Sequence, residues 1–254
     1  MVIAITREVS SRFNECEITH INRAPIDLNI ARAQHHEYVQ TLEKIGCQVI
    51  ELPEERDLPD SVFVEDAAFI LDEVAVITRP GADSRKPETE SIIRALSPHL
   101  PLVHITAPAT VDGGDVLVLG KNIYVGLSTR SNSAAIEQLQ NLLGKFGYKV
   151  IGAEMTDCLH LKTAVTRVDD KTLLINKNWV SANYFAGYYL IEVDPSEPFA
   201  ANCLPVNGQI IFPTAFPKTL AKLEARGYKI CAVNVDELAK AEGAVTCCSL
   251  IISQ

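Results

Sequence analysis

Apolar residues recur at a helical spacing in four stretches of the chain. The period of three to four residues predicts helices over 29–46, 88–97, 132–147 and 217–227. Three of these stretches end alike, with a glycine directly before a strand-like run: LEKIG-CQVIEL, LGKFG-YKVIGA and LEARG-YKICAV. A glycine just past the end of a helix commonly adopts a positive φ. The three matching endings predict a repeated helix–strand unit.

The strand-like segments repeat as well. Four of them begin with polar residues and continue as an apolar strand, a turn and a second apolar strand: VEDAAFILDEVAVITRP, GGDVLVLGKNIYVGLS, HLKTAVTRVDDKTLLINK and ANCLPVNGQIIFPTA. Their turns are typical of β-hairpins, most clearly at Asn207-Gly208. A fifth copy is split, because GAVTCCSLII ends the chain and VIAITR near the start can supply its partner strand.

Five such units closing end to end predict an α/β fold shaped as a ring, with residues 1–254 as a single domain. The alternative is a generic α/β domain in which similar phrases recur by chance. In a ring, the polar residues that open each first strand converge on the axis. These residues are Glu65-Asp66, Asp112 to Asp115, His160, Asn202 and Cys247.

Composition and charge narrow the partners. The 254 residues are 47% hydrophobic and 22% charged, as in ordinary globular proteins. The net charge of −9 would repel a phosphate backbone or an anionic membrane, so we expect neither nucleic acid nor membrane as a partner. We also expect no targeting segment and no membrane span. An acidic surface with exposed helices permits a homodimer without requiring one.

The seven cysteines are scattered and form no CxxC pair. This pattern fits neither a disulfide framework nor a zinc ribbon. We therefore expect a reduced, cytoplasmic protein without a metal site.

A thiol, an imidazole and carboxylates occupy equivalent places in separate repeats. A cysteine alone is more often an inert buried thiol, but this company favours a nucleophile. In a strand, Cys247 and Cys248 would point to opposite faces, and the phase of the repeats favours Cys247. His160 can donate a proton to a departing amine and later accept one from water. Either Asp112 or Asp115 could orient it, since spacing alone does not separate them.

Three further acids lie in PDSVFVEDAA, where Asp60, Glu65 and Asp66 lead into an apolar strand. Carboxylates in this position suit a planar cation such as guanidinium, although acidic loops are also common without a ligand. Arg85 and Arg130 follow second strands and could hold a substrate carboxylate. An arginine in such a position, taken alone, is more often an ordinary surface residue.

Six motifs in order resemble the dimethylarginine dimethylaminohydrolase family of the guanidino-modifying (pentein) superfamily: PDSVFVEDAAFI, ITRPGADSR, TVDGGDVL, YVGLSTRSN, CLHLKTAV and AVTCCSL. The likeness covers nearly the whole chain. It implies a five-bladed α/β propeller with pseudo-fivefold symmetry. It also implies hydrolysis of Nω-methylated arginines to citrulline and methylamine or dimethylamine, with no metal or organic cofactor.

The resemblance implies that Cys247 is the nucleophile, His160 the acid/base and Asp112 the residue that orients the histidine. Attack by the thiol on the guanidinium carbon would give a covalent thiouronium, which water then hydrolyses. Because a free thiol is mostly protonated at neutral pH, we expect Cys247 to be neutral in the free enzyme and to ionise as the cationic substrate arrives.

The resemblance also assigns substrate-binding positions. Asp66 matches the guanidinium-binding aspartate, with Glu65 beside it, and three residues match those that grip the amino-acid end: Asp60, Arg85 and Arg130.

Three other features bear on specificity. A lid is implied around Glu17, and Glu242 matches an acidic position whose role stays open. Arginine deiminases resemble H-x-D where this chain has His160-Leu161-Lys162, and a lysine there removes one anionic partner from an unmodified guanidinium. The alternatives are a hydrolase of arginine or of another substituted guanidine, and a non-catalytic binding protein on the same propeller.

Overall fold

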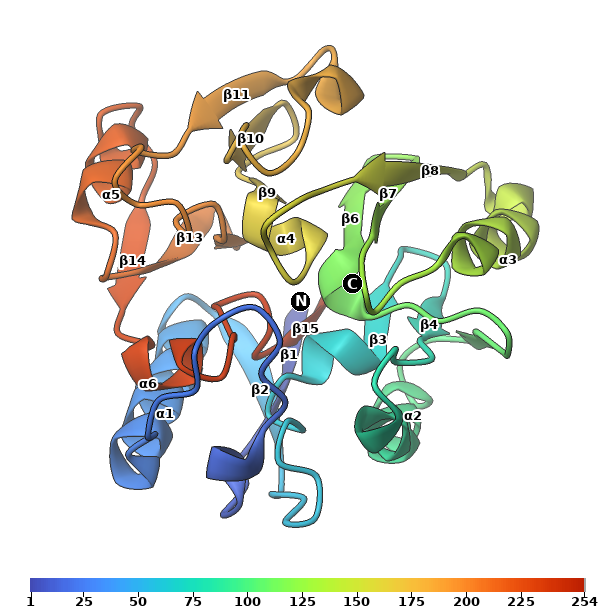
Figure 1. Cartoon of the computed structure of the whole chain (residues 1–254), viewed down its shortest axis with the longest axis horizontal. Coiled ribbons are helices and arrows are strands. Elements are labelled where there is room, and N and C mark those ends of the chain that lie inside the picture. The colour runs from blue at the N-terminus through green and yellow to red at the C-terminus, as the bar shows by residue number, and fades with distance from the viewer. Residues whose placement is uncertain (254) are drawn as a thin grey trace.

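Five three-stranded sheets surround a central axis in the computed structural model, which describes residues 1–253 (Figure 1). The first blade consists of β15 (Leu250–Ser253), β1 (Val2–Arg7) and β2 (Cys47–Leu52), and the second of β3 (Ala68–Ile70), β4 (Ala75–Ile77) and β5 (Leu102–His104). The third consists of β6 (Val116–Leu119), β7 (Asn122–Leu127) and β8 (Lys149–Glu154), and the fourth of β9 (Val165–Arg167), β10 (Thr172–Ile175) and β11 (Tyr189–Glu192). The fifth consists of β12 (Leu204–Val206), β13 (Gln209–Pro213) and β14 (Ile230–Val233).

All five blades share one topology. The middle strand pairs antiparallel with the strand before it and parallel with the strand after it. A hairpin can join the antiparallel pair, whereas the parallel pair needs a longer crossover. The crossovers of four blades contain helices: α1 (Leu28–Lys44), α2 (Thr89–Leu96), α3 (Ser133–Leu143) and α5 (Pro217–Glu224). The predicted ring of repeated units is confirmed.

The local signals that predicted the repeat have the expected geometry. Gly46, Gly147 and Gly227 follow their helices with φ of 92°, 82° and 84°. Asn207 and Gly208 both have positive φ, as a tight two-residue hairpin requires. The fourth blade differs, because its crossover contains only a short 3-10 helix, η6 (Ala182–Phe185).

The split blade closes the ring. Strand β15 pairs antiparallel with β1, with Ser253 opposite Val2, so both ends of the chain lie near the centre of the ring (Figure 1). The last residues of the chain thus complete the first blade, as the sequence predicted.

Short helical turns, rather than strands, carry the polar residues at the axis. They are η2 (Val64–Ala67), η4 (Gly113–Asp115), α4 (Leu161–Ala164, which follows His160) and a turn over 245–248. The prediction that Cys247 and Cys248 lie in a strand is therefore wrong, since β15 begins only at Leu250.

Crowding at the axis gives the reason for these turns. The Glu65 N–H donates to the carbonyl of Cys247 at 3.2 Å. A Cβ on Gly113 would lie 1.8 Å from the Glu65 carbonyl oxygen. Neighbouring turns thus touch through their backbones. A short turn fits in this narrow space because its backbone groups can bond within the turn while its polar side chain points to the axis.

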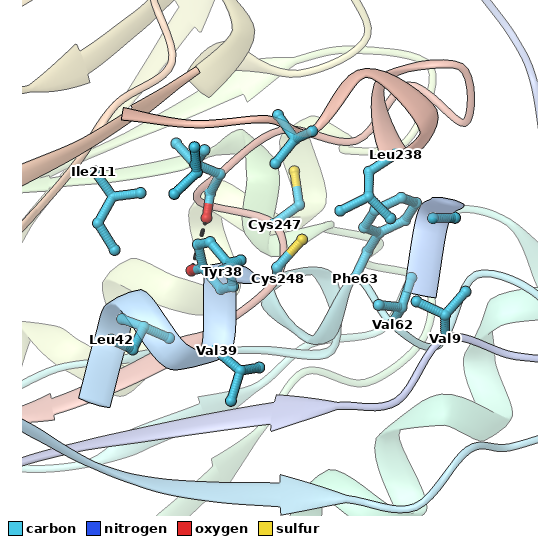
Figure 2. Close-up of a cluster of buried hydrophobic side chains, with 14 of the residues drawn as sticks. Val9, Tyr38, Val39, Leu42, Val62, Phe63, Ile211, Leu238, Cys247 and Cys248 are labelled. Carbon is cyan, nitrogen blue, oxygen red and sulfur yellow. Dashed lines mark hydrogen bonds between the residues drawn. The ribbon is translucent and has the colours of Figure 1, made fainter. Parts of the chain in front are cut away.

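Apolar clusters fill the space around the blades, and one of them supports the turn that carries the cysteines. Tyr38 of α1 donates its hydroxyl to the Val245 carbonyl at 2.9 Å. Cys248 is fully buried in the same cluster, and Figure 2 shows it beside Tyr38 with Cys247 above. The turn is thereby anchored to α1 from below.

Two further short helical elements bear on the site: α6 (Asp236–Ala239) and η3 (Asp83–Glu88). The remaining 3-10 helices are η1 (Phe13–Glu15) and η5 (Gly144–Phe146). Within residues 1–253, no helix has the length and apolar character needed to cross a bilayer.

Candidate active site

A cavity of about 300 Å³ lies at the polar end of the ring, and both predicted reacting groups line it. Cys247 reaches it from the turn before β15, and His160 from the residue before α4. The polar residues Glu65 and Lys162 also line it, together with apolar residues such as Phe216. The sequence prediction that a thiol, an imidazole and carboxylates converge is met by this arrangement.

The Cys247 thiol is neutral in the free protein. Burial raises its pKa well above 9.0, and the charges of Glu65 and Asp66 raise it further. The Ala244 N–H lies 3.4 Å from Sγ and opposes this shift only weakly. This direction agrees with the expectation of a thiol that ionises only when a cation arrives. Cys248, by contrast, is enclosed in the core and does not line this cavity.

The His160 imidazole is held between two carboxylates. Its Nε2 lies 3.2 Å from Oδ2 of Asp112, and its Nδ1 lies 4.0 Å from Oδ1 of Asp66. Burial alone would lower the pKa of His160, but Asp66, Asp112 and Asp115 outweigh it and raise the pKa to about 9. The ring is therefore protonated at neutral pH and ready to act as a proton donor.

The geometry separates the two candidates for the orienting acid. Asp115 already accepts the Leu161 N–H at 3.0 Å and the hydroxyls of Ser128 and Ser131 at 2.6 Å each. Asp112 accepts the Gly81 N–H on one oxygen and faces the imidazole with the other. Asp112 is thus the acid in contact with the histidine, and Asp115 stabilises the surrounding turns.

Asp66 carries a charge that its partners stabilise. One oxygen accepts the Gly114 N–H at 2.9 Å, and the other lies 2.6 Å from Nη1 of Arg85. Burial would raise the pKa of Asp66, but His160 and Arg85 together lower it. Arg85 also donates through Nε and Nη2 to Glu88, at 3.0 and 2.8 Å. The sequence analysis missed Glu88, whose only signal was its position three residues after an arginine.

Glu65 is compensated by a lysine. Lys162 Nζ lies 2.6 Å from its Oε1, and the Thr246 hydroxyl donates to its Oε2 at 2.8 Å. Asn202, which precedes β12, in turn donates to the Thr246 hydroxyl at 3.0 Å and ties the fifth blade into the network. The lysine of the His-Leu-Lys run therefore pairs with the carboxylate next to the thiol.

Asp60 and Arg130 lie close to the segment before α1. The Asp60 carboxylate accepts the Glu17 N–H at 3.1 Å, and burial raises the pKa of Asp60 against the opposing charge of Arg85. Arg130 donates through Nη2 to the Thr19 hydroxyl at 3.1 Å. Five of the predicted residues lie outside the cavity wall, packed against its residues or one another: Asp60, Asp66, Arg85, Asp112 and Arg130.

A chain segment covers the cavity at the place where a lid was implied. His20 and Ile21, three and four residues after Glu17, line the cavity directly. Neither residue was identified from the sequence, because nothing local links them to the site.

Three side chains at the centre also resemble a cation site. Asp66, Asp112 and His160 each place one ligand-type atom within 4.8 Å of the others. Backbone N–H groups and Arg85 already satisfy both aspartates, and His160 is itself cationic. The donor set fits this network of ion pairs and hydrogen bonds better than a bound metal ion.

Comparison with known proteins places these observations in context. Residues 6–183 match the family model described as N,N dimethylarginine dimethylhydrolase, eukaryotic. The chain is 36% identical to the N(G),N(G)-dimethylarginine dimethylaminohydrolase of Pseudomonas aeruginosa over 222 residues, 87% of each protein. It is also 36% identical to the enzyme of the same name from Streptomyces coelicolor over 248 residues, covering 97% of this chain and 95% of that one.

Solved structures agree over nearly the full length. A cysteine-to-serine mutant of the Pseudomonas aeruginosa enzyme complexed with citrulline has a TM-score of 0.94 at 33% identity and covers 98% of each chain. A histidine-to-glycine variant of a dimethylarginine dimethylaminohydrolase, an adduct with S-methyl-L-thiocitrulline, also has a TM-score of 0.94 at 33% identity, over 99% of this chain and 100% of that one. The N-terminal domain of ArgZ, an arginine dihydrolase, shares the fold with a TM-score of 0.84 at 18% identity over 100% of this chain and 98% of that one.

Proposed function

The chain belongs to the dimethylarginine dimethylaminohydrolase family, and from that premise we propose that Cys247, His160 and Asp112 carry its reaction. The protein hydrolyses the guanidino C–N bond of Nω-methylated arginines, giving citrulline and methylamine or dimethylamine through a covalent cysteine intermediate. The observation that supports the residue assignment is one cavity lined by both Cys247 and His160, with Asp112 in contact with the imidazole.

The substrate itself activates the nucleophile. A guanidinium about 4 Å from the thiol contributes up to about 4 kcal/mol at an effective dielectric constant near 20, or about three pKa units. It also offsets the charges of Glu65 and Asp66, which keep the Cys247 pKa high in the free protein. The thiol loses its proton to water as the cation binds, and the thiolate attacks the guanidinium carbon.

His160 then acts twice. Its imidazolium donates a proton to the methylated nitrogen of the tetrahedral adduct, so that the amine departs and a thiouronium remains. The neutral imidazole next takes a proton from a water molecule, whose oxygen attacks the same carbon. Cleavage of the C–S bond expels the thiolate, the remaining hydroxyl proton passes to solvent as the carbonyl forms, and citrulline is released. Asp112 holds the ring in place and stabilises its cationic form.

Substrate binding divides between two groups of residues. Glu65 faces the guanidinium from the cavity wall, Asp66 contributes its charge from outside that wall, and Asp60, Arg85 and Arg130 serve the amino-acid end. Arg85 already donates to Asp66 and Glu88 at 2.6 to 3.0 Å, whereas Arg130 donates to the neutral hydroxyl of Thr19 and its Nη1 lies 3.7 Å from Oδ2 of Asp112, beyond hydrogen-bond distance. We therefore assign Arg130 the larger share in holding the α-carboxylate.

The Lys162–Glu65 pair favours a methylated substrate. A dimethylated nitrogen has no N–H to donate, so a second free carboxylate would be left without a partner there. Lys162 supplies that partner from the protein at 2.6 Å. The rival assignment, a hydrolase of arginine itself or of another substituted guanidine, lacks this support. A non-catalytic binding protein would not require the cysteine and histidine that line the cavity.

A citrulline assay with arginine, monomethylarginine and asymmetric dimethylarginine tests the proposal. We expect turnover of both methylated substrates, with kcat/KM above that for arginine. A clear preference for arginine would overturn the assignment of substrate class while leaving the residue roles intact.

Two neighbouring cysteines provide a matched pair of variants. Cys247→Ser should abolish turnover, because a hydroxyl is a far weaker nucleophile than a thiolate near neutral pH. Cys248→Ser should retain most of kcat and lose about 1 kcal/mol of stability, because its hydroxyl enters an apolar cluster near the Ala244 carbonyl. Citrulline formation and urea unfolding measure the two effects, and the reverse result would exclude Cys247 as nucleophile.

The reaction as written uses only substrate, water and side chains of one chain. We place the protein in the cytoplasm, on the ground that all seven cysteines are free thiols. A homodimer stays a prediction from the sequence, and the site draws every residue named above from a single copy.

A further inference from the structure

One carboxylate holds the segment over the cavity. Glu242 accepts three consecutive backbone N–H groups, from Thr19 at 2.8 Å, His20 at 2.5 Å and Ile21 at 2.9 Å. These partners are more than 220 residues away in sequence. Hydrogen bonds from N–H groups to an ionised carboxylate are stronger than those to neutral acceptors.

The backbone of Glu242 is strained in a way that implies use of its side chain. Its φ of +60° lies in the left-handed region, which glycine and asparagine occupy more readily than glutamate. The residue follows α6, and the next residue, Gly243, is packed so closely that a Cβ would lie 2.2 Å from the Phe63 ring. Ala244 then donates its N–H toward the Cys247 sulfur. Glu242 is thus fixed to the turn that carries the nucleophile.

The segment that Glu242 holds also touches the residues assigned to the amino-acid end of the substrate. Thr19 accepts a hydrogen bond from Arg130, and the Glu17 N–H donates to Asp60. His20 and Ile21 line the cavity, as does Glu242 itself. We call residues 17–21 the lid segment.

We propose that Glu242 is a positioning residue that latches the lid segment onto the nucleophile turn, and that the latched segment keeps Arg130 and Asp60 in place for the amino-acid end of the substrate. The inference rests on the proposed function and adds to it a residue that touches none of the reacting atoms. It requires the lid segment to unlatch for entry of substrate and to latch again around it.

Kinetics of three variants test the latch. Glu242→Ala and Glu242→Gly both remove the carboxylate, but glycine also removes the left-handed strain. We expect each to raise KM for asymmetric dimethylarginine about tenfold while kcat changes less than about threefold. Glu242→Gln keeps one acceptor oxygen, so its KM should lie between those of the two other variants and that of the native protein. Glu224→Ala, an exposed acid on α5, is the control for loss of charge and should leave KM unchanged.

The glycine variant separates positioning from folding. If Glu242 only stabilised the fold, Glu242→Gly would lower the unfolding temperature and reduce the amount of active enzyme without changing KM. If Glu242 is a latch, Glu242→Gly should have a raised KM even though its unfolding temperature is no lower than that of Glu242→Ala. An unchanged KM in both variants would overturn the proposal.

Limited trypsin digestion gives a readout that needs no turnover. Arg23 is exposed just after the lid segment, and its guanidinium donates to the Asn14 and Cys16 carbonyls. We expect cleavage after Arg23 to be about tenfold faster in Glu242→Ala than in the native protein or Glu224→Ala. Equal rates would contradict the latch. If native protein digests slowly yet hydrolyses no methylated arginine, the proposed function fails and the latch still stands.

Discussion

At the scale of single residues, the site is governed by a surplus of buried carboxylate around one thiol and one imidazole. The same field that raises the Cys247 pKa well above 9.0 raises that of His160 to about 9. In the free site the thiol is therefore neutral and the imidazole is protonated. The thiolate is not formed in advance, and the imidazole cannot act as a base until it has given up its proton. A cationic substrate changes this balance for the thiol first, which couples nucleophile activation to binding.

The charge on His160 has a consequence for stability. Its pKa rises from 6.5 to about 9 on folding, so protonation stabilises the native state fully below pH 6.5 and this contribution is lost as pH rises through 9. The native protein should have a higher free energy of unfolding than His160→Gln at pH 6. We expect this difference between the two proteins to shrink by about 3 kcal/mol when the pH is raised to 10.

Urea unfolding across this pH range measures the difference, with His36→Gln on the exposed side of α1 as control. A gap between native and His160→Gln that stays constant with pH would mean that the imidazole is not charged in the folded protein.

We expect substrate preference to depend on Lys162, which pairs with Glu65. Lys162→Met keeps an apolar stem of similar length but leaves the Glu65 carboxylate without its cation. The freed carboxylate can accept from an unmodified guanidinium, so we expect kcat/KM for arginine to rise about tenfold relative to asymmetric dimethylarginine. Lys171→Met, in an exposed hairpin turn, serves as control in the citrulline assay. An unaltered ratio would show that the pair has no part in selection.

At the scale of elements, the short turns before the inner strands bring the chemistry together. Each turn exposes one or two polar groups at the axis and then passes directly into an apolar strand. Their close contact explains why glycines stand at two successive positions of the third blade. A Cβ on Gly114 would lie 2.5 Å from His160 Nδ1 and 2.9 Å from Asp66 Oδ1.

Two glycine variants separate crowding at the axis from ordinary helix capping. Gly114→Ala should lower kcat/KM by about a hundredfold, because the imidazole and its carboxylate must shift. Gly147→Ala, past the end of α3 with φ of 82° and open space around it, should cost about 1 kcal/mol of stability and leave kcat/KM unchanged. Full activity in Gly114→Ala would contradict the contact between these turns.

At the scale of the whole molecule, ring closure joins the two ends of the chain in one blade, where Val2 pairs with Ser253 at the end of β15 remote from Cys247. The strand that follows the nucleophile pairs with the first strand of the chain, and both strands bury apolar residues in one cluster with the second blade. No blade holds the complete site, since the thiol, the imidazole and the two groups of carboxylates come from different blades. Activity is therefore a property of the closed ring.

Because the five blades share one topology, we predict that the chain ends can be moved to the hairpin of another blade, which would then be the split blade. A circular permutant that joins the present ends through a short flexible linker and opens between Asp170 and Lys171 should fold, with Tm within about 10 °C of the native protein. The opened turn is exposed and lies outside the paired strands.

A second permutant, opened between Leu173 and Leu174 inside β10, should fail to fold, because both residues are buried and paired. Circular dichroism and the citrulline assay would follow both permutants. Equal behaviour of the two would show that blade integrity does not control folding.

The sequence by itself determined the repeated unit, because helix periodicity, terminal glycines and hairpin turns depend on residues a few positions apart. From the order of these units it also determined the ring, its split blade, and the set of residues that meet at the axis. The motifs were specific enough to identify the family.

Only the tertiary structure decided how those residues bond to one another. It selected Asp112 over Asp115 for the imidazole, replaced the expected strand at Cys247 by a helical turn, and paired Arg85 with Glu88. It also joined Glu242 to the lid segment. Apart from the Arg85–Glu88 pair, these outcomes depend on crowding and contact between blades, where the partners are 46 to 223 residues apart in sequence. No local pattern contains that information.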